Sequence, residues 1–207
     1  KVDMQQELKK IQRELQRTVL FITHDLDEAM RIGDHIAIME EGRIVQIGSP
    51  EQILVNPRTD YVAKFVEHAD PTGVITAGTI ALPFESDAFE HAGERDGIRF
   101  SHRRDHPEIR YGRDRDGRLT AVMIDERTVP VRHLDEVLDA AEGTEVSSLR
   151  AEVALTCSEE AVLRHVLRGR LHSTLPVIVT TADGRVLGLI DDPELINGIL
   201  EKRGHGA

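Results

Sequence analysis

Several kinds of residue and run that define particular protein classes are scarce in this sequence. Its 207 residues include no Trp and only 3% aromatic residues, so the core has to be built from Leu, Ile, Val and Ala. The single cysteine, Cys157, excludes an intrachain disulfide, fits a reducing compartment and is most simply a small buried residue. No apolar run approaches the roughly 20 residues of a membrane-spanning helix, and no signal peptide opens the sequence.

Basic residues are also in the minority. The net charge of -11 argues against a general nucleic-acid-binding protein, which would carry a basic face, so no nucleic acid is expected as a partner. With 40% hydrophobic and 30% charged residues, the composition is that of an ordinary globular protein with one large domain or two small ones. We therefore expect a cytoplasmic protein, or one on the cytoplasmic face of a larger assembly.

The first third of the chain alternates between helix and strand patterns. Apolar residues at spacings of four and three predict an amphipathic helix: Met4, Leu8, Ile11 and Leu15. The β-branched and apolar run "TVLFIT", Thr18–Thr23, predicts a buried strand, and a helix is expected over about Leu26–Ile32, before Gly33. His24 stands between this strand and this helix, which is where α/β proteins place ligand chemistry.

A hairpin and two short helices are expected next. "HIAIME" and "IVQIG" flank Glu41 and Gly42, and this pattern predicts two strands joined by a tight turn. Ser49 as N-cap and Pro50 at the first helical position predict the start of a short helix. A further helix is expected over Thr59–Glu67, with an apolar side made of Tyr61, Val62 and Phe65.

The remainder of the chain contains an internal repeat, which begins after a linker candidate at Asp70–Gly73. "RYGRDRDGRLTAVMIDE" and "LPVIVTTADGRVLGLIDDPEL" each contain a strand, an Asp-Gly-Arg turn, a second strand and acidic residues that open a helix. The turns are centred on Gly117 and Gly184. Helices are expected upstream, over roughly Ser86–Glu94 and Ser158–Arg168. Each copy is too small to bury its apolar face alone, so the two are expected to pack together.

These patterns resemble two known families joined end to end. "TVLFITHDLDEAMRIGDHIAIMEEGRIVQIGSPEQIL" resembles the C-terminal end of an ABC-transporter ATPase domain, and residues 72–203 resemble a tandem of CBS domains. The combination is similar to the C-terminal part of the ATP-binding subunit of glycine betaine/proline-type importers. The resemblance implies an α/β (α+β) fold: an ATPase segment over residues 1–70, a divergent CBS repeat over 71–140 and a second over 141–207.

The resemblance assigns a role to His24. "THDLDEA" matches the switch-histidine loop, whose histidine contacts the γ-phosphate and the attacking water of ATP, and a structural histidine is the alternative. The sequence contains no G-x-x-x-x-G-K-[ST] loop, no "LSGGQ"-like signature and no Walker B strand. We therefore expect ATP and Mg²⁺ to bind only in the intact subunit, and this chain not to hydrolyse ATP alone. Lys1 opens directly into a helix pattern, as in a fragment of a longer protein.

Paired CBS domains imply a ligand cleft between the hairpins, with an adenine nucleotide or cyclic di-AMP as the expected occupant. The candidate residues are Asp191 and Glu194 in the second copy and Glu126 in the first. Asp191 stands where the family pattern has a hydroxyl residue, and its carboxylate would repel a nearby phosphate. Asp192 and Glu194 also fit an ordinary helix start around Pro193, as N-cap and first-turn acid.

The segment from His102 to Arg118, "HRRDHPEIRYGRDRDGR", mixes arginines with acidic residues. It is compatible with binding phosphates or an anionic lipid surface, but the interspersed acids favour a solvated, salt-bridged face. His102 and His106 are spaced as metal ligands on a helix, yet no third ligand is apparent, so no metal is expected.

The function implied by the resemblance is regulatory. The CBS pair of an osmoprotectant importer (glycine betaine, proline, carnitine or choline) would sense a ligand or ionic strength and gate ATP-driven uptake. Expected partners are the permease subunits and a second ATPase subunit that dimerises through the CBS domains, on the inner face of the cell membrane. The alternative is that the CBS pair only dimerises the subunits and binds no ligand.

Overall fold

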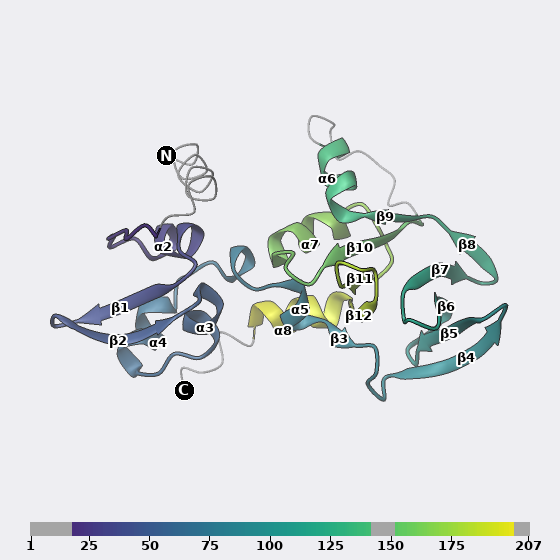
Figure 1. The fold of residues 1–207 in the computed structure, drawn as a ribbon, viewed down its shortest axis with the longest axis horizontal. Helices are drawn as coiled ribbons and strands as arrows, with labels where there is room; N and C mark the ends of the chain where they lie inside the picture. Colours follow the sequence, from purple (N-terminus) through teal and green to yellow (C-terminus); the bar gives the residue numbers. More distant parts are fainter. Residues whose placement is uncertain (1–17, 142–151, 201–207) are drawn as a thin grey trace. The chain divides into compact units, whose positions relative to one another are not determined.

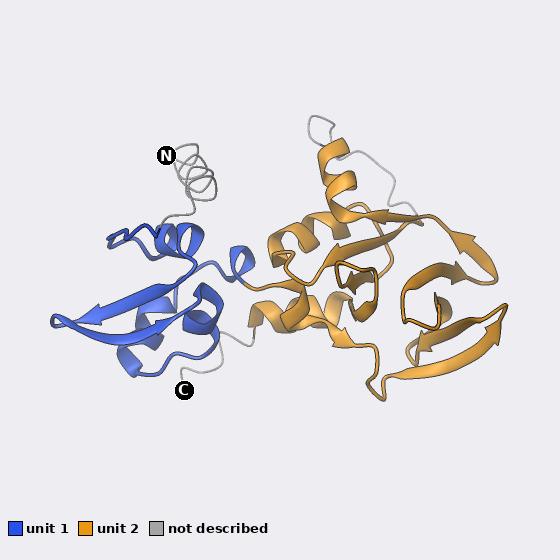
Figure 2. Ribbon diagram, in the orientation of Figure 1, with its two compact units in different colours: residues 1–74, 201–207 blue, residues 75–200 orange. Residues whose placement is uncertain are grey.

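The computed structural model describes residues 18–141 and 152–200, and the chain forms two compact units (Figure 2). Unit 1 comprises residues 1–74 and 201–207, and unit 2 comprises residues 75–200. Helices and several sheets are mixed along the chain (Figure 1), which confirms the predicted α/β (α+β) class. The helix expected around Met4 to Leu15 lies outside the described residues.

Unit 1 is a β-hairpin with short helices against one of its faces. Its described elements are α2 (Leu26–Ile32), β1 (Ile36–Glu40), β2 (Arg43–Gly48), α3 (Pro50–Val55), α4 (Asp60–Val66) and the 3₁₀ turn η1 (Pro71–Gly73). The hairpin prediction is confirmed: β1 pairs antiparallel with β2, and Glu41 and Gly42 form the turn with φ of 48° and 76°. The expected linker, Asp70–Gly73, lies close to the boundary between the units.

The predicted helix starts in unit 1 are also confirmed. The Ser49 side chain accepts a hydrogen bond from the backbone N–H of Gln52, whose side chain accepts one from the Ser49 N–H in return. Ile53 in α3 and Val62 in α4 are fully buried and anchor the core of unit 1. Tyr61 and Phe65 stack on each other but remain 36% and 40% exposed, so they lie at the edge of this core.

The strand predicted over Thr18–Thr23 is absent, and that prediction was wrong for this chain. The segment has no regular secondary structure and pairs with no strand among the described residues. Leu20 and Ile22 are 89% and 88% exposed, and Val19 and Phe21 are each 45% exposed. A buried strand needs neighbouring strands to satisfy its backbone and layers to cover its faces. The apolar run has the propensity for a strand but lacks that environment.

Unit 2 contains two five-stranded sheets. The mixed sheet has the order β3 (Leu82–Pro83), β12 (Val186–Ile190), β11 (Val177–Thr180), β10 (Ala154–Ser158), β9 (Val131–His133). The meander sheet is antiparallel, in the order β4 (Phe89–Arg95), β5 (Ile98–Arg103), β6 (His106–Arg113), β7 (Leu119–Ile124), β8 (Arg127–Val129). The helices are α5 (Ala77–Ile80), α6 (Leu134–Ala141), α7 (Leu163–Arg170) and α8 (Asp192–Leu200).

The first copy of the repeat differs from its prediction on both sides of the hairpin. The helix expected over Ser86–Glu94 is instead a turn followed by β4, which pairs with β5 and carries Gly93 at φ 108° in an irregular register. The helix expected after β7 is also absent. Asp125 and Glu126 take φ of 45° and 70°, which a right-handed helix does not allow, and turn the chain into β8. Pairing within the meander sheet outweighed the local helical pattern.

The second copy follows its prediction more closely. It runs β10, α7, β11, β12, α8, although α7 starts at Leu163 rather than near Ser158. Both predicted hairpins form, as β6–β7 and β11–β12.

The expectation that the two copies pack together is confirmed. Tyr111 and Val122 of the meander sheet share an apolar cluster with Ile178 and Leu189 of the mixed sheet.

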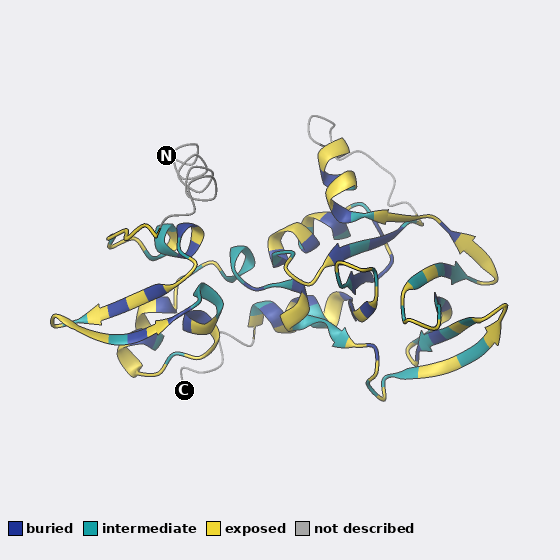
Figure 3. Ribbon diagram, viewed as in Figure 1, coloured by how far each residue is buried: buried dark blue, intermediate teal, exposed yellow. Residues whose placement is uncertain are grey.

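Burial is concentrated on the mixed sheet and on the helices against it (Figure 3). A second cluster in unit 2 joins α5, α6, α7 and α8 to the sheet and includes Cys157, which is 0% exposed as predicted. No helix among the described residues is long and apolar enough to cross a membrane.

Candidate functional site

His24 lies immediately before Asp25, the N-cap residue of α2, and its side chain is exposed. Its neighbours are fixed: Asp25 caps α2 by accepting a hydrogen bond from the Glu28 N–H, and the Thr23 hydroxyl donates to Glu28 Oε2 at 2.7 Å. The Asp25 N–H donates in turn to Thr23 Oγ1. The imidazole itself makes no hydrogen bond or ion pair with any described residue. The sequence thus builds a short hydrogen-bonded turn that leaves the histidine exposed.

Asp191 and Glu194 meet where β12 leads into α8. Asp191 directly precedes α8 and donates its N–H to Glu194 Oε2 at 2.9 Å, which satisfies one backbone group of the helix start. The Asp192 N–H donates to Asp191 Oδ1, also at 2.9 Å. Since α8 begins at Asp192, Pro193 occupies its second position rather than its first. Both candidate carboxylates therefore take part in starting the helix.

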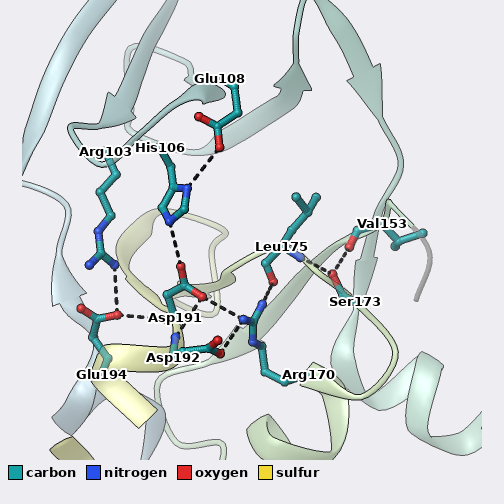
Figure 4. A network of polar contacts seen from close by, with 10 residues as sticks. All are labelled: Arg103, His106, Glu108, Val153, Arg170, Ser173, Leu175, Asp191, Asp192 and Glu194. Carbon is teal, nitrogen blue, oxygen red and sulfur yellow. Dashed lines mark hydrogen bonds and ion pairs between the residues drawn. The ribbon is translucent and has the colours of Figure 1, made fainter. Parts of the chain in front are cut away.

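Two arginines pair with these carboxylates (Figure 4). Arg170 is the last residue of α7, and its Nη2 lies 2.8 Å from Asp191 Oδ1 and 2.7 Å from Asp192 Oδ1. Its Nη1 also donates to the Leu175 carbonyl. Arg103, at the end of β5, donates to Glu194 Oε2 at 3.0 Å. The side chains of Arg103, Arg170, Asp191 and Glu194 are only 10–13% exposed. We refer to these four residues, together with His106, Glu108 and Asp192, as the Asp191 network.

His106, the first residue of β6 in the meander sheet, also belongs to the Asp191 network. Its Nε2 lies 3.5 Å from Asp191 Oδ2, and its Nδ1 lies 3.1 Å from Glu108 Oε1 (Figure 4). His102, whose spacing from His106 resembles that of metal ligands on a helix, lies in β5 instead, and its Nε2 is 3.7 Å from Glu90 Oε2. No group of three or more His, Cys, Asp or Glu side chains is placed to hold a metal within residues 18–141 and 152–200.

The third candidate, Glu126, does not belong to the Asp191 network. It occupies the β7–β8 turn, its side chain is 73% exposed, and it pairs with Arg110 on β6. The structure therefore joins two of the three predicted cleft residues directly and leaves the third on the meander sheet.

Burial and charge act against each other in the Asp191 network. Burial alone would lower the pKa of Arg103, but the hydrogen bond and the charge of Glu194 more than offset it, so that pKa is raised. Tyr111 is buried beside the network, and its pKa is strongly raised by burial and then by the charge of Asp191. These surroundings keep Arg103 charged and Tyr111 neutral.

The segment from His102 to Arg118 is paired, as its interspersed acids predicted. Arg103 contacts Asp105 at 2.8 Å, and Arg118 contacts Asp116 at 3.4 Å. Arg113 lies 4.1 Å above the Phe84 ring and pairs with Glu85. The carboxylate of each pair is at least 55% exposed, but Arg103 and Arg113 are only 10% and 13% exposed, so the segment is salt-bridged as expected and only partly solvated.

The sequence did not indicate that Arg103 and Arg170 would occupy the two candidate carboxylates. Arg103 belongs to the segment for which the sequence predicts a solvated face, and Arg170 lies just beyond the helix expected over Ser158–Arg168. Their partners are 91 and 21 residues away in the chain, and no local pattern reports a contact at that separation.

The amino-acid sequence is similar to the sequences of several known transport proteins. The glycine betaine/carnitine transport ATP-binding protein of Listeria monocytogenes is 36% identical over 198 residues, covering 91% of this chain and 45% of that protein. The glycine betaine transport ATP-binding protein of Bacillus subtilis is 58% identical over 78 residues, 38% of this chain and 19% of that protein. The glycine betaine/proline betaine transport system ATP-binding protein of Escherichia coli is 54% identical over 81 residues, which cover 39% of this chain and 20% of that protein. No family model matches the chain.

The homologues of this chain are the ATP-binding proteins of glycine betaine-type ABC transporters. The resemblance drawn from the "THDLDEA" segment is thereby confirmed. This chain spans less than half the length of each of the relatives named above. The match to the Listeria protein covers 91% of the chain, so it includes residues of both compact units.

Proposed function

We propose that this chain is the C-terminal part of the ATPase subunit of an osmoprotectant importer. The observation that carries the proposal is the 36% identity to a glycine betaine/carnitine transport ATP-binding protein over 91% of the chain. In this proposal unit 1 belongs to the ATPase domain, and unit 2 is the regulatory region.

In the ATPase domain, His24 serves as the switch histidine. An imidazole donates a hydrogen bond to the charge that develops as the γ-phosphate is transferred. Support comes from its open position on a turn that Asp25 and Thr23 hold in place. ATP and Mg²⁺ are held by other parts of the intact subunit, which works with a second ATPase subunit and with permease subunits on the inner face of the membrane. The exposed segment Val19–Ile22 is then a strand of the complete ATPase sheet.

The test is uptake of radiolabelled glycine betaine by cells that carry the intact subunit with its permease. We expect His24→Ala to abolish uptake and ATP hydrolysis at wild-type expression. His35→Ala, which changes an exposed histidine of the same unit, is the matched control and is expected to retain both. Normal uptake with His24→Ala would refute the assigned role.

Unit 2 is proposed to gate this activity, with an adenine nucleotide, cyclic di-AMP or ionic strength as the signal. A nucleotide ribose would be held by Asp191 and Glu194, with Glu126 as the candidate of the first copy, and an anionic lipid surface is a further contact for the arginine-rich segment. A bound ribose has to take Asp191 from Arg170 or Glu194 from Arg103, because both carboxylates are already paired.

Calorimetric titration of this chain with AMP, ATP and cyclic di-AMP, at low and high potassium chloride, tests the ligand directly. Micromolar binding of one nucleotide that is lost in Asp191→Asn and retained in the surface variant Asp87→Asn supports ligand sensing. Circular dichroism of both variants checks that they are folded.

A second function is favoured by one observation. Because the candidate carboxylates are satisfied by arginines within the chain, unit 2 is also suited to act as an interaction module that dimerises the subunits and binds no ligand. Absence of nucleotide binding together with a salt-independent dimer in analytical ultracentrifugation would support this function over sensing.

A further inference from the structure

We infer that His106 is a proton-sensitive latch between the meander sheet and the start of α8. His106 belongs to β6 of the meander sheet, whereas Asp191 connects β12 of the mixed sheet to α8. The contact between His106 Nε2 and Asp191 Oδ2, at 3.5 Å, therefore joins the two sheets of unit 2.

We call the latch closed when the His106 imidazole attracts the Asp191 carboxylate. The number of protons on the imidazole decides whether it does. Each of its ring nitrogens faces a carboxylate oxygen, Nδ1 toward Glu108 at 3.1 Å and Nε2 toward Asp191 at 3.5 Å. An ionised carboxylate only accepts hydrogen bonds, and a neutral imidazole has one N–H. Both contacts can be attractive at once only in the doubly protonated imidazolium. After deprotonation, the lone pair of one nitrogen faces an anion.

The charges around His106 are mostly negative. On its own strand Glu108 faces Nδ1, and from the β12–α8 junction Asp191 faces Nε2. Across the ladder, β5 contributes Arg103, whose charge is shared by Asp105 and Glu194. From α7, Arg170 neutralises the other oxygen of Asp191 and also pairs with Asp192. Counted together, these groups comprise five carboxylates and two guanidinium groups, so the imidazole lies in a cluster of net negative charge.

Burial gives the latch its effect. The Asp191 side chain is 12% exposed, so its contact with His106, which is 40% exposed, is screened less by salt than a surface pair would be. The proton reaches the half-exposed ring from solvent and changes a contact at a mostly buried carboxylate. Since imidazole changes charge between about pH 5 and 8, the latch is closed at the acid end of this range and opens as the pH rises.

As a means of controlling transport, the latch rests on the proposed regulatory role of unit 2, but the structural event does not. Hydrogen exchange on this chain measures the event without any transport reaction. We expect protection factors, corrected for intrinsic exchange rates, to fall about three- to tenfold between about pH 5.5 and pH 8 in peptides containing His106 and Asp191. Peptides of unit 1 serve as the internal reference.

Two variants test the proton count. Glu108→Gln gives Nδ1 an amide that can donate to it, so a neutral ring can satisfy both contacts and the fall in protection is expected to disappear while His106 remains. His106→Gln removes the titrating group and is expected to show no fall. His102→Gln is the matched control, because His102 contacts Glu90 through one nitrogen and within the meander sheet, and it is expected to behave as the wild type.

Nitrogen NMR of the histidine rings in the wild-type chain keeps the inference testable if a variant does not fold. His106 is expected to show both ring nitrogens protonated at about pH 5.5 and to lose one proton over the range in which protection falls. A ring that is neutral throughout, or wild-type pH dependence in Glu108→Gln or His106→Gln, overturns the latch. Loss of the latch without any change in transport would instead count against the proposed regulatory function.

Discussion

Arg118 and Arg185, the third residues of two Asp-Gly-Arg turns, face each other in an antiparallel bridge. Backbone hydrogen bonds run in both directions, from the Leu119 N–H to the Gly184 carbonyl and from the Val186 N–H to the Gly117 carbonyl. The two copies of the repeat thus meet through equivalent positions. This arrangement has the symmetry of an internal twofold axis at the turns, although the segments that flank the two hairpins fold differently.

The backbone conformation of the two turn glycines predicts how much stability is lost when each is replaced by alanine. Gly117 and Gly184 have φ of 81° and 83°, and an added Cβ would meet no atom within 4 Å. Backbone strain is then the main cost, so we expect Gly117→Ala and Gly184→Ala each to lower the unfolding free energy of unit 2 by about 1–2 kcal/mol. Urea unfolding with hydrogen exchange on the β11 and β12 peptides measures this. Gly42→Ala, at φ 76° in unit 1, carries the same strain and is expected to leave those peptides unchanged.

The Asp191 network predicts unequal costs for two adjacent arginines. Arg103→Ala leaves Glu194 mostly buried without its cation and is expected to lower the unfolding free energy by about 3 kcal/mol. Arg104→Ala removes an exposed pair with Glu90 and is expected to cost less than about 1 kcal/mol. Equal effects in urea unfolding would show that burial of the Arg103 pair is energetically unimportant.

Cys157 predicts a loss of stability in alkali. Burial, and to a smaller extent the charge of Asp135, raises the pKa of this thiol to about 12, well above its ordinary 9.0. Between these values the unfolded chain releases the thiol proton and the folded chain keeps it, so stability falls as the pH rises. By about pH 10.5 the contribution is about 2 kcal/mol.

The measurement is the unfolding free energy of the wild type minus that of Cys157→Ala as a function of pH. Subtraction removes the titration of Tyr and Lys residues, which both proteins share. A difference that stays constant through this range would mean that the folded thiol ionises normally.

A substitution in the exposed segment before His24 is expected to cost different amounts of stability in this chain and in the intact subunit. Ile22 is 88% exposed, so Ile22→Ser is expected to change the stability of this chain by less than about 0.5 kcal/mol. In the intact subunit, where this run is proposed to be a buried strand, the same change is expected to cost about 2–4 kcal/mol. Ile53→Ser, at a fully buried position in unit 1, is the control and is expected to destabilise both proteins. Thermal unfolding of the two pairs distinguishes the cases.

Local chemistry was sufficient for the elements whose stability is local. The cap at Ser49, the turn at Glu41 and Gly42, and the turns at Gly117 and Gly184 follow from groups only a few residues apart, so their sequences predict them directly. The resemblance carried by "THDLDEA" also depends on contiguous residues, and the comparisons confirmed it. The candidate at His24 was therefore accessible from the sequence, including its place just before a helix.

Tertiary structure decided the rest. The run at Val19–Ile22 has strand propensity, but a strand also requires neighbours, and here the run is exposed and pairs with no strand among the described residues. Residues 89–94 of the expected helix fold as a strand because β5 pairs with them. The resemblance to CBS domains pointed to Asp191 and Glu194, yet their partners Arg170 and Arg103 are brought to them by the folding of unit 2. The sequence determined which groups are present and which local turns and caps they form. Only the fold determined which charges meet, because the energy of a buried charge depends on neighbours that are distant in the chain.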